Sequence, residues 1–456
     1  KFIQDALKAA VSQVDAHSSF FMPKSYKSMM ESTKGEFSGI GVSVITKNPE
    51  DETLDIIDVI EDGPAFKAGL ETGDKIVEVN GEKLKGLSGD EVVNLLKGKT
   101  GTVVTIKLIR KKKPLEFKVV RSIIKDQTSS CYFFEEQNVY YVMLKVFNEV
   151  AAEQVRDILQ KANKGKCKGI VLDLRRNPGG TLDSAIEMAG LFVNKGSLVV
   201  STRDNNGKLI AEYRTTQDPV LASDVPIFIM VDNFTASASE ILAGALRYHS
   251  NQTDKHKHLK VFLIGTETFG KGSVQELIPI KNDCALKLTT MLYYLPINEL
   301  IQAIGIKPDF TILPKITPSQ EMKWVNELYG KESSLKSHIT LAEVQNKAKE
   351  EEKENKTGFW SKLFKATEDT GFTDVAKAKK DKPDNKDPKE DKESWEKKQR
   401  ESISHDVQVQ ASVSLINLFD FAKKNGIKAI ETRAGAITFL RKNFLTDDDI
   451  KVVKIR

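Results

Sequence analysis

A chain of 456 residues predicts two to four domains and leaves room for a substantial buried core. The net charge of +5 is small for this length, so neither nucleic acid nor a membrane surface is indicated as a partner. Three cysteines without C-x-x-C spacing (Cys131, Cys167 and Cys284) indicate neither a disulfide framework nor a zinc site, and no apolar run is long enough to span a membrane. Because the chain opens on Lys1, a signal peptide or anchor ahead of it would not be visible in this sequence.

The first part of the chain predicts a helical segment followed by a β-rich domain. Residues 1–35 begin with apolar side chains at helical spacing. Residues 36–121 contain short stretches in which apolar and polar positions alternate, and one of these strands ends at the turn Asn80-Gly81. One clear helix is expected in this domain, opened by a capping box that begins at Ser88.

Residues 122–318 predict an α/β domain. Strands are expected at residues 139–144, 169–174, 226–231 and 261–265. The last three are apolar runs of the kind found in buried parallel sheets, and an amphipathic helix is expected over 151–161. Strands that alternate with helices favour a layered sheet with helices packed on it.

The remaining chain predicts helices on either side of a charged linker. Residues 319–346 are expected to form a helical extension. Residues 347–404 mix dense charge of both signs and cannot bury enough apolar surface to fold alone, so a disordered linker is predicted. A C-terminal helical segment over 405–456 should follow, with Asp406 as its N-cap.

A glycine-containing stretch, Phe37-Ser38-Gly39-Ile40-Gly41, marks the start of the β-rich domain. Its glycines leave N–H groups free to converge on an anion, and an open strand edge would let a peptide add as a further strand. The long stretch from Glu61 to Gly81 resembles a PDZ domain. That resemblance implies that the stretch 37–41 binds the carboxylate of a peptide C-terminus and that Val93 and Leu96 contact its last apolar side chain. A glycine-rich hairpin without a ligand is the alternative.

Three motifs in the α/β domain point to catalysis. Residues 235–240 (T-A-S-A-S-E) place a serine in a small-residue turn before an apolar helix, and residues 268–275 (T-F-G-K-G-S-V-Q) place a lysine between two glycines. Serine needs a nearby base, and no histidine or G-x-S-x-G motif offers the usual setting, so lysine is the candidate base of a Ser/Lys hydrolase. Residues 173–180 (D-L-R-R-N-P-G-G) follow a strand, where two glycines can present N–H groups to an oxyanion.

These motifs in this order, behind a PDZ-like domain, resemble the carboxyl-terminal processing proteases, also called tail-specific proteases. The resemblance extends from about Asp15 to Phe310 and includes the stretches 15–19, 34–37, 147–149 and 301–309. It implies a multidomain α/β fold in which a PDZ-type β-rich domain precedes an α/β protease core, with helical N- and C-terminal segments. It also implies an enzyme that needs no cofactor.

Carried over residue by residue, the resemblance implies that Ser237 is the nucleophile, Lys271 the general base and Gln275 the side chain that orients the lysine. Ser239 is the competing nucleophile, and a helix-capping hydroxyl is its alternative role.

The same resemblance implies that the oxyanion is bound by the backbone N–H of Ala238 and of one glycine in the pair Gly179 and Gly180. Glu240 is expected to support the lysine or the turn.

The lysine chemistry requires a neutral amine. The ordinary pKa of lysine, about 10.4, leaves it charged at neutral pH, and lowering it by roughly 2–3 units corresponds to about 3–4 kcal/mol. Burial in an apolar pocket can supply this difference. Gln275 suits such a pocket because it orients the amine without adding a negative charge.

Several positions depart from the family pattern. Phe234 stands where a glycine is common, and residues 298–300 replace a usual Gly-Arg-Ser, so substrate contacts there are expected to differ. A longer stretch between residues 245 and 261 contains His249, His256 and His258. A metal-dependent hydrolase built on these histidines is one alternative, but no carboxylate or cysteine completes a ligand set, so a solvated insert is preferred and no metal site is predicted.

The leading interpretation is a serine endopeptidase that cleaves near the C-termini of unfolded or flexible protein substrates, with the PDZ domain capturing the tail. The rival interpretation is a non-catalytic PDZ scaffold on a degenerate protease core. The resemblance implies a periplasmic or envelope location, and it leaves room for a regulatory adaptor protein and for membrane association through a segment ahead of Lys1. No nucleic-acid partner is expected.

Overall fold

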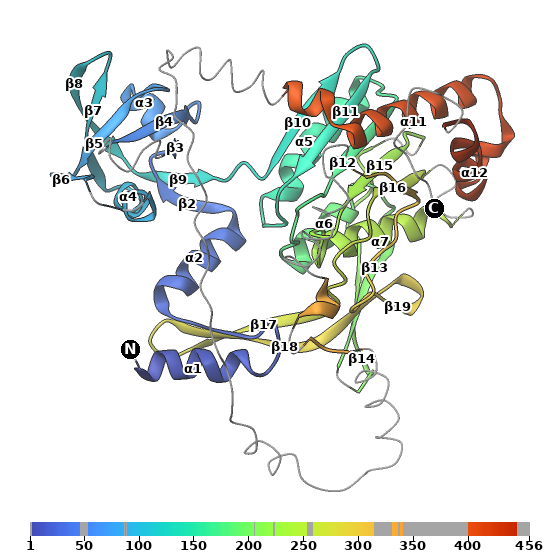
Figure 1. Ribbon diagram of the computed structural model, residues 1–456, viewed down its shortest axis with the longest axis horizontal. Helices are drawn as coiled ribbons and strands as arrows, with labels where there is room; N and C mark the ends of the chain where they lie inside the picture. The colour runs from blue at the N-terminus through green and yellow to red at the C-terminus, as the bar shows by residue number, and fades with distance from the viewer. Residues whose placement is uncertain are drawn as a thin grey trace, which may run out of the picture. The chain divides into compact units, whose positions relative to one another are not determined.

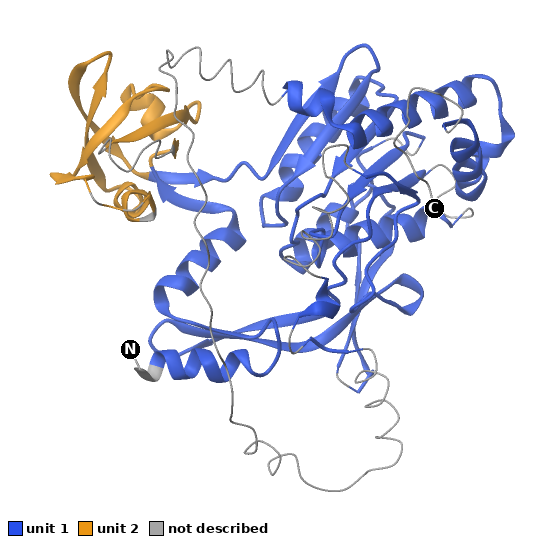
Figure 2. Ribbon diagram, viewed as in Figure 1, with its two compact units in different colours: residues 1–39, 122–344, 398–456 blue, residues 40–121, 345–397 orange. Residues whose placement is uncertain are grey.

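The computed structural model describes residues 2–45, 53–85, 87, 89–204, 206–221, 224–252, 259–313, 331–335, 338–340 and 400–444. They fall into two compact units (Figure 2). Unit 1 contains the described parts of residues 1–39, 122–344 and 398–456, and unit 2 contains those of residues 40–121. None of the described helices is long and apolar enough to cross a membrane.

Unit 2 is built on one sheet whose strands lie in the order β3-β4-β5-β7-β8, with β6 paired to β5 (Figure 1). The strands are β3 (Val42–Ile45), β4 (Leu54–Val59), β5 (Lys75–Val79), β6 (Glu82–Lys83), β7 (Val103–Arg110) and β8 (Lys113–Val120). Asn80 and Gly81 join β5 to β6 with φ values of 52° and 85°, which confirms the predicted turn. The apolar faces of the strands and two helices enclose a single core.

The sequence predicts one clear helix in this unit, whereas the residues that the structure describes there form two. α3 (Pro64–Ala68) lies inside the motif 61–81, begins at a proline and ends at Gly69, whose φ is 87°. Five residues are too few to reveal a helical period in the sequence. The second helix is α4 (Gly89–Leu96), and Ser88 of the predicted capping box lies outside the described residues.

Unit 1 contains a central sheet in the order β10-β11-β12-β15-β16-β20 (Figure 1). The strands are β10 (Ser129–Phe134), β11 (Val139–Leu144), β12 (Gly169–Asp173), β15 (Ile227–Val231), β16 (Val261–Gly265) and β20 (Phe310–Thr311). All neighbouring pairs are parallel except β10 with β11. Every residue of β12, β15 and β16 is buried, which explains their apolar runs and confirms the strands predicted there.

Helices cover both faces of this sheet. On one face, alternate strand residues such as Leu172 and Ile229 pack with α5 (Ala151–Lys164), α6 (Leu182–Ala189) and α7 (Ala238–Ser250). On the other, Val171 and Phe228 pack with α11 (Val407–Lys424), η4 (Lys428–Glu431) and α12 (Arg433–Phe444). Asp406 accepts hydrogen bonds from the first turn of α11, so its predicted N-cap role is confirmed. The C-terminal helices therefore complete the core.

A second sheet in unit 1 has the order β1-β18-β13-β14, and β17 and β19 also pair with β18. Its strands are β1 (Ser19–Phe21), β13 (Leu198–Arg203), β14 (Leu209–Arg214), β17 (Ser273–Ile280), β18 (Cys284–Leu295) and β19 (Glu299–Leu300). In the chain, α1 (Phe2–Ser12) precedes β1, and α2 (Pro23–Lys34) and β2 (Glu36–Gly39) follow β1. β2 pairs with β9 (Ser122–Lys125). The sequence did not predict this sheet, although the fold class itself is confirmed.

The predicted extension and linker fall mostly outside the described residues. Within 319–346 the structure describes residues 331–335, where Glu332–Ser334 form the 3-10 turn η2, and residues 338–340. Of the predicted linker, only residues 400–404 are described, and they are helical. η1 (Pro296–Asn298) is a further short turn after β18.

Candidate functional site

The three motifs predicted to be catalytic meet because they follow neighbouring parallel strands. Residues 173–180 begin at the last residue of β12, residues 235–240 come after β15 and residues 268–275 come after β16. These strands are adjacent and parallel, so their carboxyl ends share one edge of the sheet. Phe269 N–H also donates to the carbonyl of Thr235 at 3.0 Å, which ties the lysine loop to the serine turn.

Ser237 sits at a strained junction between strand and helix. It is the N-cap of α7, with φ 56° and ψ −117°, a region that non-glycine residues rarely adopt. Its neighbours Ala236, Ala238 and Ser239 are buried, whereas Ser237 is only partly buried. A sharp strand-to-helix turn of this kind presents a serine hydroxyl for attack, although the sequence lacks the glycine pattern that usually announces it.

Glu240 is the residue that brings the serine turn and the lysine loop together. Its side chain is fully buried, and Oε2 accepts the N–H of Ser237 at 2.9 Å and the N–H of Lys271 at 3.0 Å. Oε1 accepts the N–H of Gly270 at 2.8 Å and the hydroxyl of Thr268. Burial raises the pKa of Glu240 to about 7, although these four hydrogen bonds favour the carboxylate. Because one oxygen serves both, the Ser237 and Lys271 nitrogens lie within about 6 Å of each other.

Lys271 has the environment of a potential base. Burial lowers its pKa to about 8, and the negative charge of Glu332 opposes that shift. Its Nζ donates to Gln275 Oε1 at 2.7 Å and to the carbonyl of Ser273 at 3.4 Å. The structure places no hydrogen bond between Lys271 Nζ and Ser237 Oγ among the described residues; such contacts often tighten only with substrate bound.

Tyr293 contacts the backbone of both Ser237 and Lys271. Its hydroxyl contacts the carbonyl of Ser237 at 3.3 Å and the carbonyl of Lys271. The residue is almost fully buried, and burial raises its pKa well above the ordinary value, so it stays a neutral hydrogen-bond donor. The sequence offered no signal for this residue beyond its place in a strand that follows the lysine motif.

The glycine pair approaches the serine turn closely. A Cβ on Gly179, whose φ is 96°, would lie 2.8 Å from both Ser237 Cβ and Ala238 N. A Cβ on Gly180 would lie 2.0 Å from the carbonyl oxygen of Phe147. Both positions therefore require glycine.

Of the two glycine N–H groups, one is already used. Gly179 N–H donates to Asn177 Oδ1 at 2.9 Å. The N–H groups of Gly180 and Ala238 have no acceptor among the described residues. Gly180 and Ala238 are thus the pair whose donors remain available to a ligand.

Ser239, the competing nucleophile, is fully buried, and its hydroxyl donates to the carbonyl of Asn177 at 3.1 Å. The histidines of the predicted insert are only partly described. His249 is buried with Nε2 2.8 Å from the carbonyl of Leu198, whereas His256 and His258 lie outside the described residues. Within the described part of the chain, no three histidine, cysteine or acidic side chains gather as a metal site would require.

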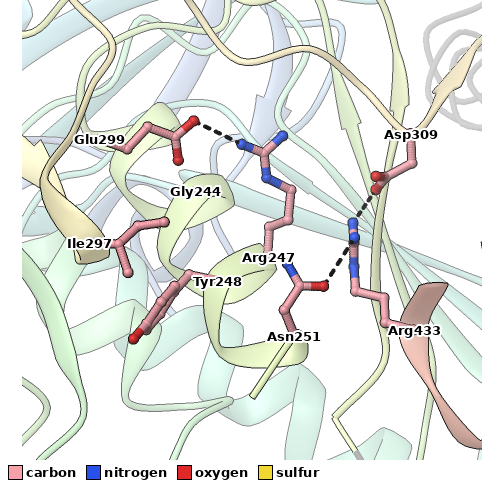
Figure 3. Close-up of a pocket in the computed structure, with 8 residues that line it drawn as sticks. All are labelled: Gly244, Arg247, Tyr248, Asn251, Ile297, Glu299, Asp309 and Arg433. Carbon is pink, nitrogen blue, oxygen red and sulfur yellow. Dashed lines mark hydrogen bonds and ion pairs between the residues drawn. The ribbon is translucent and has the colours of Figure 1, made fainter. Parts of the chain in front are cut away.

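A separate cavity of about 290 Å³ lies at the other end of α7 (Figure 3). Its lining residues are Gly244, Arg247, Tyr248, Asn251, Ile297, Glu299, Asp309 and Arg433. Arg247 pairs with Glu299, and Arg433 pairs with Asp309 and donates to Asn251 Oδ1 at 3.3 Å (Figure 3). The charged groups that line it are therefore satisfied by one another, and the cavity begins two helical turns beyond Ser237.

The residues predicted to bind a peptide occupy different environments. Phe37, Ser38 and Gly39 belong to β2 of unit 1 and pair with β9. In unit 2, Ile40 is buried, and the N–H groups of Ile40 and Gly41 have no acceptor among the described residues. They lead directly into β3, which lies at one edge of its sheet.

On α4 of unit 2, the predicted contacts differ in exposure. Val93 is partly exposed, whereas Leu96, like Val92, is buried in the core of the unit. Of the two α4 side chains predicted to contact a peptide, Val93 is therefore the one that is accessible to a ligand.

Comparisons with known proteins cover both units. The model of peptidase family S41 matches residues 138–312, and a PDZ domain model matches residues 56–110. A carboxy-terminal-processing protease of Bartonella bacilliformis is 38% identical over 346 residues, which are 74% of this chain and 75% of that protein. A probable CtpA-like serine protease of Staphylococcus aureus is 35% identical over 299 residues, 65% of this chain and 57% of that protein. A solved photosystem II D1 C-terminal processing protease is 25% identical, with 72% of this chain and 86% of that chain covered and a TM-score of 0.41.

Proposed function

From the premise that the chain belongs to the carboxy-terminal-processing proteases of peptidase family S41, and is therefore a serine-type peptidase, we propose that Ser237 is its nucleophile and Lys271 its general base. The observation that carries the proposal is the buried carboxylate of Glu240, one oxygen of which holds the backbone N–H of both residues.

In the first step, neutral Lys271 takes the hydroxyl proton of Ser237 as Oγ bonds to the carbonyl carbon of the substrate. The carbonyl oxygen gains negative charge. The N–H groups of Gly180 and Ala238 donate to that oxygen, because both are unused in the described structure.

In the second step, the Lys271 ammonium gives its proton to the departing amine, and the peptide C–N bond breaks. The acyl group remains on Ser237 Oγ. Neutral Lys271 then accepts a proton from a water molecule as the water oxygen attacks the acyl carbon. The Lys271 ammonium returns that proton to Ser237 Oγ as the bond between Oγ and the acyl carbon breaks, which releases the carboxylic acid and restores the serine hydroxyl and the neutral amine.

We propose that unit 2 captures the C-terminal tail of a protein substrate. The edge strand β3 offers unpaired backbone to an added strand, and the N–H groups of Ile40 and Gly41 suit a terminal carboxylate. A tail held in this way is present at the nucleophile at a high effective concentration.

The test is cleavage of an unfolded protein such as casein. Ser237→Ala should lower turnover by at least about a thousandfold while a C-terminal peptide still binds. Ser239→Ala is the matched control and should retain most of its turnover, since that hydroxyl is buried against Asn177. Equal activity of Ser237→Ala and the unaltered protein would refute the assignment, and no turnover by the unaltered protein would favour the non-catalytic scaffold.

The periplasmic or envelope location, an activating adaptor and membrane association through a preceding segment are proposals that rest on the family alone. Fractionation of cells that naturally produce the protein, probed with an antibody to unit 1, would decide the location.

A further inference from the structure

A chain of hydrogen bonds leads from Lys271 into the N-terminal segment. Lys271 Nζ donates to Gln275 Oε1 at 2.7 Å, and Gln275 Nε2 donates to Thr289 Oγ1 at 3.1 Å. Thr289 Oγ1 in turn donates to Asp15 Oδ1 at 2.9 Å. The chain joins β17, β18 and the connection between α1 and β1, so residues more than 250 positions apart in sequence contribute to it.

This chain of hydrogen bonds ends at Asp15, whose carboxylate accepts hydrogen bonds and donates none. The side chain of Asp15 is buried and accepts hydrogen bonds from the N–H of His17 at 2.7 Å, the N–H of Ser18 at 3.0 Å and the hydroxyls of Ser18 and Thr289. Burial by itself would raise the pKa of Asp15, but these hydrogen bonds outweigh it and hold the pKa below its ordinary value. Asp15 is therefore ionised wherever the enzyme works.

An ionised Asp15 decides the direction of every bond in the chain. A hydroxyl has one hydrogen, and Thr289 donates it to Asp15. In any other hydrogen bond, Thr289 Oγ1 must therefore be the acceptor. Only the NH₂ group of Gln275 can donate there, and Gln275 Nε2 donates also to Ser273 Oγ at 2.9 Å. The carbonyl oxygen of Gln275 consequently faces Lys271.

The orientation of Gln275 controls where the lysine lone pair points. A neutral amine has two hydrogens and one lone pair. Lys271 places its donors on Gln275 Oε1 and on the carbonyl of Ser273, so the lone pair takes the remaining direction. With the Gln275 amide reversed, its NH₂ group would donate to that lone pair and occupy the base.

We infer that Asp15 and Thr289 are positioning residues, which act through Gln275 to keep the Lys271 lone pair free for the serine proton. This inference rests on the proposed function of Lys271 as general base. Ser18 strengthens the arrangement, because its hydroxyl accepts the N–H of Thr289 at 3.2 Å and donates to Asp15.

The decisive variant is Thr289→Val, which keeps the side-chain shape and removes the hydroxyl. In the full chain, kcat for casein should fall by roughly 10- to 100-fold with little change in KM, and the acid limb of the kcat profile should move to lower pH. The limb moves because a reversed Gln275 amide no longer accepts a hydrogen bond from the Lys271 ammonium, so the pKa of Lys271 falls. Thr289→Ser, which keeps the hydroxyl, should leave both kcat and the position of the acid limb at their original values.

Thr290→Val is the matched control on the next residue of the same strand. The Thr290 hydroxyl is buried and has no hydrogen-bond partner among the described residues, so kcat should stay within about threefold of the original. A loss of turnover in Thr289→Val without a shift of the limb would show a merely structural role and overturn the inference.

Asp15→Asn is the second variant and decides the matter if Thr289→Val does not fold. It should lower kcat about tenfold and shift the limb in the same direction, and an unchanged limb and kcat would overturn the inference. Failure of the proposed function is a separate result, because it appears as turnover that survives Ser237→Ala.

Discussion

At the scale of single residues, the proposed mechanism depends on the pKa of Lys271. Burial lowers it from the ordinary 10.5 to about 8, a difference that corresponds to roughly 3 kcal/mol against the ammonium. Gln275 is uncharged, so it orients the amine without reversing this effect. Glu240 contributes a charge nearby, but it is placed on the backbone N–H groups rather than on the amine.

The pH profile tests this residue directly. Lys271 is a base only when neutral, so kcat/KM should rise tenfold per pH unit below about 8 and level off above it. At pH 6 the rate should be about one hundredth of the plateau. His17, which pairs with Glu332 at 2.7 Å, is the titratable neighbour to distinguish. An acid limb that disappears in His17→Gln would contradict the assignment of Lys271.

At the scale of elements, the site depends on three strands whose ends are aligned. β12, β15 and β16 are short, buried and parallel, and each is followed by a loop that carries one motif. The strained turn at Ser237 costs of order 1–3 kcal/mol, and the surrounding hydrogen bonds of Glu240 and the close contact of Gly179 hold it in place. In unit 2 the proposed binding of a substrate tail depends instead on the open edge of β3.

The edge of β3 leads to a binding prediction. In the Ser237→Ala background, a peptide with a free C-terminal carboxylate should bind at least about tenfold more tightly than the same peptide with a C-terminal amide. Val93→Asp should weaken binding by a similar factor, because it places a charge at the partly exposed position of α4. The same change at the exposed Val103 of β7 is the control. Equal affinity for the acid and the amide, measured by calorimetry, would rule out capture through the N–H groups of Ile40 and Gly41.

At the scale of the whole molecule, the two units have separate hydrophobic cores. The core of unit 2 contains residues between Ile40 and Val119, and the two cores of unit 1 contain residues from 134 onward. The chain leaves and re-enters unit 1 at Gly39 and Ser122, which face each other as partners in the β2–β9 ladder. A two-residue turn is long enough to join such partners.

Removal of unit 2 should therefore leave a folded protease. We expect a chain in which residues 40–121 are replaced by Asn-Gly to unfold cooperatively, because its own cores are intact. It should still cleave casein in a Ser237-dependent way, but it should lose the preference for a free C-terminus, measured with a tailed substrate and its amidated counterpart. A preserved preference would place tail recognition in unit 1.

Much of this molecule could be predicted from local patterns. The buried strands after which the motifs come, the turn at Asn80-Gly81 and the N-cap at Asp406 are short-range features, which depend on residues a few positions apart. The five-residue helix α3 and the sheet formed by β13, β14, β17 and β18 were missed. A very short helix has no visible period, and strands of mixed exposure give no clean alternation.

The sequence by itself determined the family, the order of the motifs and the residues proposed to carry the chemistry. The tertiary structure alone decided that Gly180 rather than Gly179 keeps a free N–H, that the C-terminal helices cover one face of the central sheet and that Asp15 and Thr289 stand behind Gln275. The physical reason is that each of these depends on contacts between segments far apart in the chain. Hydrogen-bond direction and burial come from how those segments pack, and no local pattern encodes them.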